Sequence, residues 1–76
     1  MELTEAIQII EQVISDKNSD GDNWYSLNLN SQPDEQADGS FKEIYRADCL
    51  FMVTGGWSST ISGALISLAE RLKGAE

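Results

Sequence analysis

Apolar residues recur at spacings of three and four near both ends of this chain, which is the pattern of a helix that buries one face. The first set is Leu3, Ala6, Ile7, Ile10, Val13 and Ile14, and the second is Ile61, Ala64, Leu65, Leu68, Ala69 and Leu72. We predict one helix over residues 3–17 with Thr4 as its N-cap, and a second helix capped by Ser58 or Ser59. Gly74 is expected to end the second helix in a left-handed conformation.

The residues between the two helices predict extended structure. Tyr25, Leu27 and Leu29 alternate with polar residues, as in a half-buried strand. Residues 41–54 form either one long strand with a bulge or two strands joined by a turn near residues 46–48, and the poor turn chemistry there favours the long strand. Residues 31–40 have no apolar period, so we expect a mobile acidic loop.

This order of elements predicts a single α+β domain over residues 1–76, helix–strand–strand(–strand)–helix, with both helices packed on one face of an antiparallel sheet. A core in so short a chain leaves only a few kcal/mol of stability, which favours a homodimer or a tight partner. Gly63 weakens an exposed helix by about 1 kcal/mol relative to alanine. Close approach of another backbone, such as that of a second copy of the chain, would explain a glycine at this position. The alternative is that the helix simply tolerates the glycine.

The negative charge is concentrated in the first half of the sequence. The formal net charge is -8, and it comes entirely from residues 1–38, because residues 39–76 hold as many basic as acidic residues. Such a field repels nucleic acid phosphates and attracts basic protein surfaces. We therefore expect no direct binding of nucleic acid, and either a solvated acidic surface or a face that imitates a nucleic acid backbone.

The absence of histidine excludes several kinds of catalysis. Ser-His-Asp and Cys-His sites both need an imidazole base, and a structural zinc site would have to use carboxylates. The only cysteine, Cys49, opens an apolar run, so we expect an inert thiol and no disulfide. The sequence thus predicts a protein that is not an enzyme and that uses no metal or cofactor.

The sequence carries no signal for secretion or for a membrane. Its N-terminus is acidic where a signal peptide is basic, and its longest apolar run, residues 49–53, is far shorter than the roughly 20 residues of a membrane span. We expect a cytoplasmic protein that does not bind a membrane.

Two short motifs suggest ligands, and each has a simpler interpretation. Residues 16–21 match the opening of a calcium loop, but Leu27 replaces the glutamate at its twelfth position. A helix end rich in turns is the simpler interpretation, and a weak calcium site there would use Asp16, Asn18, Asp20 and Asp22. The Gly55-Gly56 turn before the second helix could hold a small anion, together with Ser58 and Ser59, although a tight turn with an N-cap is simpler.

The leading functional hypothesis is an inhibitor of a nucleic-acid-handling protein that binds a basic surface, such as a nucleic-acid-binding groove. In size, charge and absence of catalytic motifs the chain has the character of the anti-defence proteins of phages, anti-CRISPR proteins among them. Trp57 follows two glycines and is a candidate anchor at the interface. The expected contact residues are Glu5, Glu11, Asp20, Asp22, Asp34, Glu35, Asp38 and Trp57. The alternative is a domain that binds or sequesters a small anionic ligand, such as a nucleotide, at Gly55, Gly56, Ser58 and Ser59.

Overall fold

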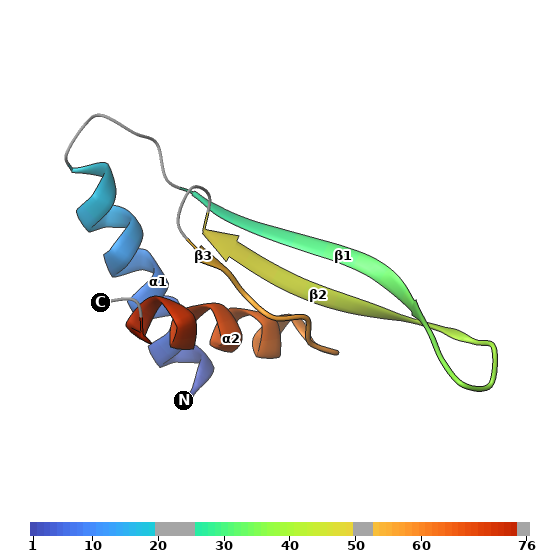
Figure 1. Cartoon of the computed structure of the whole chain (residues 1–76). Helices are drawn as coiled ribbons and strands as arrows, with labels where there is room; N and C mark the ends of the chain where they lie inside the picture. The colour runs from blue at the N-terminus through green and yellow to red at the C-terminus, as the bar shows by residue number, and fades with distance from the viewer. Residues whose placement is uncertain (20–25, 50–52, 75–76) are drawn as a thin grey trace.

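The computed structural model describes residues 1–19, 26–49 and 53–74. Its elements are, in chain order, α1 (Leu3–Asn18), β1 (Leu27–Glu35), β2 (Phe41–Cys49), β3 (Val53–Thr54) and α2 (Ile61–Gly74). The three strands form one antiparallel sheet in the order β1-β2-β3, and the helices pack against it (Figure 1). The predicted α+β class and the order of the elements are confirmed.

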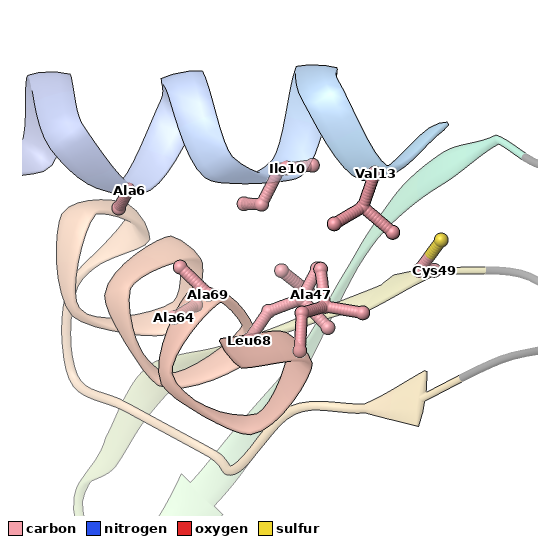
Figure 2. Close-up of a cluster of buried hydrophobic side chains, with 9 residues drawn as sticks. Ala6, Ile10, Val13, Ala47, Cys49, Ala64, Leu68 and Ala69 are labelled. Atoms are coloured by element: carbon pink, nitrogen blue, oxygen red, sulfur yellow. The ribbon is translucent and has the colours of Figure 1, made fainter. Parts of the chain in front are cut away.

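The core lies where α2 packs on β2 and α1 packs on α2. Its buried side chains come from α1 (Ala6, Ile10, Val13), β2 (Ala47, Cys49) and α2 (Ala64, Leu68, Ala69, Leu72) (Figure 2). Three of the core residues on α1 and α2 are fully buried alanines, Ala6, Ala64 and Ala69. Such small side chains allow the axes of the two helices to approach closely. The helical periodicity of the sequence therefore identified most of the core faces of both helices, but Leu3, Ile7 and Ile61, which were predicted on these faces, are exposed.

The β1–β2 hairpin extends beyond the helices as an arm (Figure 1). Every residue of β1 is exposed, and burial along β2 rises from an exposed Phe41 to a buried Cys49. The molecule is accordingly elongated, with extents of 49 × 25 × 17 Å. Only the base of the hairpin, near Ala47 and Cys49, takes part in the core.

The turn of the hairpin is tightly built. The Gln36 N–H donates to the Ser40 carbonyl at 2.7 Å, and the Gly39 N–H donates to the Gln36 carbonyl at 3.0 Å. Gly39 has a φ of 87°, in the left-handed region that glycine adopts at little cost. These features describe a three-residue hairpin loop, in which a type I turn is followed by a bulge at glycine.

The prediction of a loop over residues 31–40 is wrong in its first half, because residues 31–35 continue β1. Ser31, Gln32 and Pro33 pair with Tyr45, Ile44 and Glu43. The low strand propensity of this stretch is overridden by its pairing with the β-formers of β2, as happens often for strands. Residues 36–40 form the turn itself.

The preference for one long strand over residues 41–54 is also wrong. β2 and β3 are separate antiparallel strands that pair through Asp48↔Thr54 and Cys49↔Val53, so the chain reverses after Cys49 and not near residues 46–48. Beyond β3, Ser58 forms an isolated antiparallel bridge with Tyr45. Between the pairs Asp48↔Thr54 and Tyr45↔Ser58, the segment after β3 has one residue more than β2. One extra residue on one of two paired strands defines a β-bulge.

The predicted helix ends differ in detail. α1 begins at Leu3, because the Ala6 N–H already bonds to the Glu2 carbonyl; Thr4 therefore lies within the first turn and is not the N-cap. Thr60 caps α2 in place of Ser58 or Ser59: its Oγ1 accepts the Gly63 N–H at 3.0 Å.

Two glycines in α2 also differ from expectation. Gly74 remains within the helix, and Gly39 is the glycine with a positive φ among the described residues. At Gly63 a Cβ would collide with the Ser58 hydroxyl and lie 3.0 Å from Thr60 Oγ1, so the chain's own capping segment accounts for this glycine.

Candidate functional site

The alternation of residues along the hairpin gives its sheet two unlike faces. Leu27 and Leu29 pair with Cys49 and Ala47, and all four side chains point to the face that α2 covers. Their neighbours along the strands point to the opposite face, which carries no helix. We call this second side the open face.

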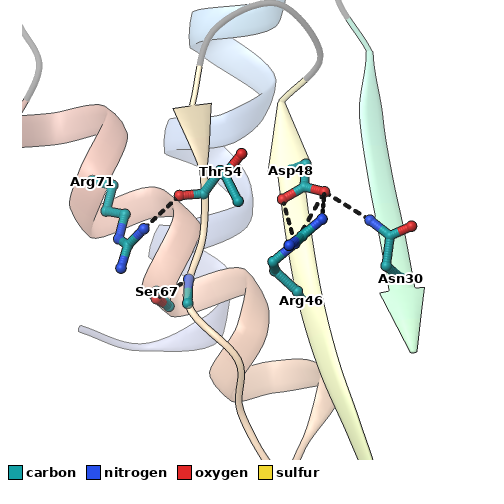
Figure 3. A network of polar contacts seen from close by, with 7 residues as sticks. Asn30, Arg46, Asp48, Thr54, Ser67 and Arg71 are labelled. Carbon is teal, nitrogen blue, oxygen red and sulfur yellow. Dashed lines mark hydrogen bonds and ion pairs between the residues drawn. The ribbon is translucent and has the colours of Figure 1, made fainter. Parts of the chain in front are cut away.

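A polar cluster lies on the open face at the base of the hairpin (Figure 3). Arg46 Nε lies 3.0 Å from Asp48 Oδ1, and Arg46 Nη2 donates to Asp48 Oδ2 at 3.1 Å. Asn30 Nδ2 donates to the same Oδ2 at 2.7 Å, from β1. Arg46 and Asp48 thus neutralise each other's charge. The hydrogen bond from Asn30 links the pair to β1.

Trp57 completes this cluster. The Arg46 guanidinium lies over the indole ring at 5.0 Å from its centroid, within cation–π range. The Tyr45↔Ser58 bridge places Trp57 opposite Arg46, so the two side chains share the open face. Trp57 remains 41% exposed. A half-exposed tryptophan held by an arginine is the kind of side chain that anchors protein interfaces.

The end of the hairpin carries a second group of candidate residues, Asp34, Glu35 and Asp38, which we call the acidic tip. All three are exposed, and the only salt bridge within residues 1–19, 26–49 and 53–74 is that of Arg46 with Asp48. Hydrogen bonds from the Ser40 hydroxyl at 2.6 Å and the Ser40 N–H at 3.0 Å lower the pKa of Asp38. The acidic tip therefore presents exposed carboxylates that form no salt bridge among the described residues, and Lys42, opposite Asp34 in the hairpin, is the basic residue paired with this group.

The remaining predicted carboxylates do not join this group. Glu5 and Glu11 lie on α1, where Glu5 lines a groove with Lys73, and Glu11 borders an apolar groove with Leu27. Asp20 and Asp22 lie outside the described residues. The structure thus brings together Asp34, Glu35 and Asp38 and separates them from the acidic residues of α1.

The Gly55-Gly56 turn uses its backbone donors internally. The Gly55 N–H donates to the Ala47 carbonyl at 2.9 Å, and the Ser58 N–H donates to the Tyr45 carbonyl at 2.8 Å. The Gly56 N–H donates to Ser67 Oγ at 2.9 Å, and Arg71 Nη1 donates to the neighbouring Thr54 carbonyl at 2.7 Å (Figure 3). An anion at this turn would have to displace bonds that hold β2, β3 and α2 together.

The motif expected to offer a weak calcium site is only partly described. Asp16 accepts a hydrogen bond from Gln12 Nε2 at 2.8 Å, its carbonyl accepts one from Ser19, and residues 20–22 lie outside the described segments. Over the described part of the chain, no three histidine, cysteine, aspartate or glutamate side chains are grouped so that they could hold a metal ion. Neither described helix has the length and apolar character needed to cross a membrane.

Sequence reasoning identified the acidic tip and Trp57 but missed Asn30, Arg46 and Asp48. The strand alternation around Ala47 could have placed Arg46 and Asp48 on one face of the sheet. That inference requires knowing that β2 continues to Cys49. The cluster also depends on pairing with β1, and local sequence does not specify that pairing. Comparison with known protein families, curated proteins and solved structures found no match to this chain.

Proposed function

We propose that this chain is a non-enzymatic inhibitor of a nucleic-acid-handling protein, and that its acidic tip enters a basic groove of that protein. The observation that carries the proposal is an exposed arm whose end holds more acidic than basic residues and no salt bridge among the described residues (Figure 1). A basic groove that accepts a phosphate backbone offers the charges that such an arm requires. The anti-defence role belongs to the same proposal and rests on the size and charge of the chain.

The charge of the arm supports this mode of binding. Residues 34–43 hold four acidic residues against Lys42 alone, for a net charge of -3. The hydrogen bonds from Ser40 lower the pKa of Asp38, so its carboxylate stays ionised at neutral pH and into more acidic solution than an ordinary aspartate. The internal hydrogen bonds of the turn hold the tip in one shape, which reduces the conformational entropy lost on binding.

Trp57 and Arg46 provide a second point of attachment in this proposal. Asp34 and Asn30 are separated by an even number of positions along β1, so both side chains point to the open face, where Trp57 also lies. A partner that binds the arm from this side would contact Asp34 through charge and Trp57 through apolar burial, whereas Glu35, the next residue along β1, points to the other face. The tip would then govern the rate of association and its salt dependence, and Trp57 the lifetime of the complex.

The test is capture from a nuclease-treated bacterial lysate on the immobilised chain, at low and at high salt. We expect the captured protein to elute as salt rises and to be displaced by added duplex DNA or by RNA. The tip variant carries Asp34→Asn, Glu35→Lys and Asp38→Asn. Asparagine at position 38 can still accept the Ser40 hydrogen bonds, and asparagine at position 34 places no second positive charge opposite Lys42. This variant should lose capture while its thermal unfolding changes little.

A matched control carries Glu5→Lys and Glu11→Lys on α1, and it should retain capture because these residues lie away from the tip. Capture that persists in the tip variant, or that nucleic acid does not displace, would refute the proposal. Loss of capture in Trp57→Ala together with full capture by the tip variant would instead assign binding to the open-face cluster.

A further inference from the structure

Among the described residues, no strand pairs with the outer edge of β1, which lies at one side of the sheet. The Gln36–Ser40 bond fixes which residues face β2, because hydrogen-bonded and non-hydrogen-bonded pairs alternate along an antiparallel ladder. Asn28, Asn30, Gln32 and Asp34 therefore bond to β2. The N–H and carbonyl groups of Leu27, Leu29, Ser31 and Glu35 point away from it. Pro33 lies among these outward positions, where its missing N–H removes no bond of the ladder.

This edge is protected by proline only at Pro33, near its far end, and the rest of it lacks the features that keep strand edges apart. Residues 27–33 carry no charge, whereas edge strands that resist association carry lysine or other charged residues. Leu27 and Leu29 are 44% and 47% exposed, although they point to the face that the helices cover. Beside Leu27 lies an apolar groove of about 220 Å³, which is also lined by Ile7, Ile10 and Leu65. Polar backbone groups and apolar side chains are thus left open along the same side of the molecule.

We propose that this edge pairs with the β1 edge of a second copy, in an antiparallel arrangement about Leu29 that gives a two-fold dimer with a continuous six-stranded sheet. Ser31 then lies opposite Leu27 of the second copy, and each Leu29 lies opposite the other. The three outward pairs each exchange two backbone hydrogen bonds. Pro33, which cannot donate, stays outside this register.

A second copy fits the edge for two reasons of symmetry and charge. The two-fold axis is perpendicular to the sheet, so both helix layers lie on the same face and the two apolar grooves face each other across the seam. Antiparallel pairing also sends the two acidic tips to opposite ends of the dimer, which limits the repulsion between chains of net charge -8. A basic partner would find no carboxylate on residues 27–33, and the groove beside Leu27 is lined by one carboxylate, that of Glu11. The inference does not depend on the proposed function.

The first test is the mass of the wild-type chain by sedimentation over a range of concentrations. We expect twice the 8.4 kDa of one chain, and tighter association as salt screens the repulsion. This salt response is opposite to that expected for the proposed partner. A chain that keeps the mass of one copy up to millimolar concentration would overturn the inference.

Two substitutions test the register. Ser31→Pro removes an outward N–H without touching the ladder to β2, and Leu29→Lys places two like charges opposite each other at the centre of the seam. Both variants should sediment as single chains. Ser31→Ala, which keeps the N–H, and Phe41→Lys, which changes a side chain that is 67% exposed at the far end of the hairpin, should remain dimers.

Amide hydrogen exchange provides a readout that a merely destabilised chain would not reproduce. In the dimer, the amides of Leu27, Leu29 and Ser31 should be protected together with those of Asn28 and Asn30. In Leu29→Lys the outward set alone should lose protection. Rapid exchange of the outward amides in a wild-type dimer would place the contact on another surface and refute the proposed seam.

Discussion

The close packing around Gly55 makes a sharp prediction for Gly55→Ala. Gly55 is buried, and a Cβ built there would lie 2.6 Å from the Ala47 carbonyl oxygen and 3.3 Å from both Cα and Cβ of Leu68. The oxygen and the Leu68 Cα belong to the backbones of β2 and α2, so neither can turn aside as a flexible side chain could. The substitution must push the β-bulge away from the core.

Two contributions to the free energy of unfolding make Gly55→Ala less stable, and a third opposes them. Overpacking a well-packed site costs about 1–3 kcal/mol, and weakening the 2.9 Å bond from the Gly55 N–H to the Ala47 carbonyl adds about 1 kcal/mol. Alanine restricts the unfolded chain more than glycine does, which offsets about 0.4–1 kcal/mol. We expect a net loss of roughly 2 kcal/mol, or about 10 °C in Tm for a domain of this size.

Urea unfolding followed by circular dichroism measures this loss as a lower midpoint at an unchanged slope. The matched control is Gly74→Ala at the end of α2, where a Cβ would meet nothing within 4 Å and the stability should stay the same or rise slightly. If Gly55→Ala proves as stable as Gly74→Ala, the contact of the bulge with β2 and α2 does not exist as described.

Further predictions follow from particular residues. Leu68→Ala should lower the free energy of unfolding by about 2–5 kcal/mol, because Leu68 is fully buried between β2 and α1, and thermal unfolding measures the loss. Gly39→Ala should cost about 1 kcal/mol in the same assay because of its positive φ, although the space around it is open. Burial raises the pKa of the Cys49 thiol above 9.0, so its contribution to stability is constant below pH 9.0 and is lost as the pH rises further. The decline in alkaline solution should be steeper in the wild type than in Cys49→Ala. Ser40→Ala should return the lowered pKa of Asp38 toward 3.8 in an NMR titration, and an unchanged pKa would contradict the role of the Ser40 hydrogen bonds.

The candidate site was predictable where it depends on local chemistry. The acidic tip and Trp57 stand out in the sequence because carboxylates and a glycine-flanked tryptophan are conspicuous by residue type. The partners of Trp57 could not be predicted, since Asn30, Arg46 and Asp48 meet only when β1, β2 and the segment beyond β3 lie side by side. The separation of Glu5 and Glu11 from the tip has the same origin, because it depends on how far the hairpin extends from the helices.

The sequence by itself determined both helices and the central part of their buried faces, since helical periodicity is a local property that places Ile10 and Leu68 toward the core. It did not show that Leu3, Ile7 and Ile61 on the same faces stay exposed, because that depends on which elements lie opposite them. It did not determine where β1 ends, because Ser31, Gln32 and Pro33 have little strand propensity and adopt a strand only through bonds to β2. Nor did it locate the caps, since Ser58 is drawn into a bridge with Tyr45 and it is Thr60 that accepts the Gly63 N–H at the start of α2. Strand length, register and caps depend on hydrogen bonds between residues far apart in the chain, and only the tertiary structure decides which of those bonds form.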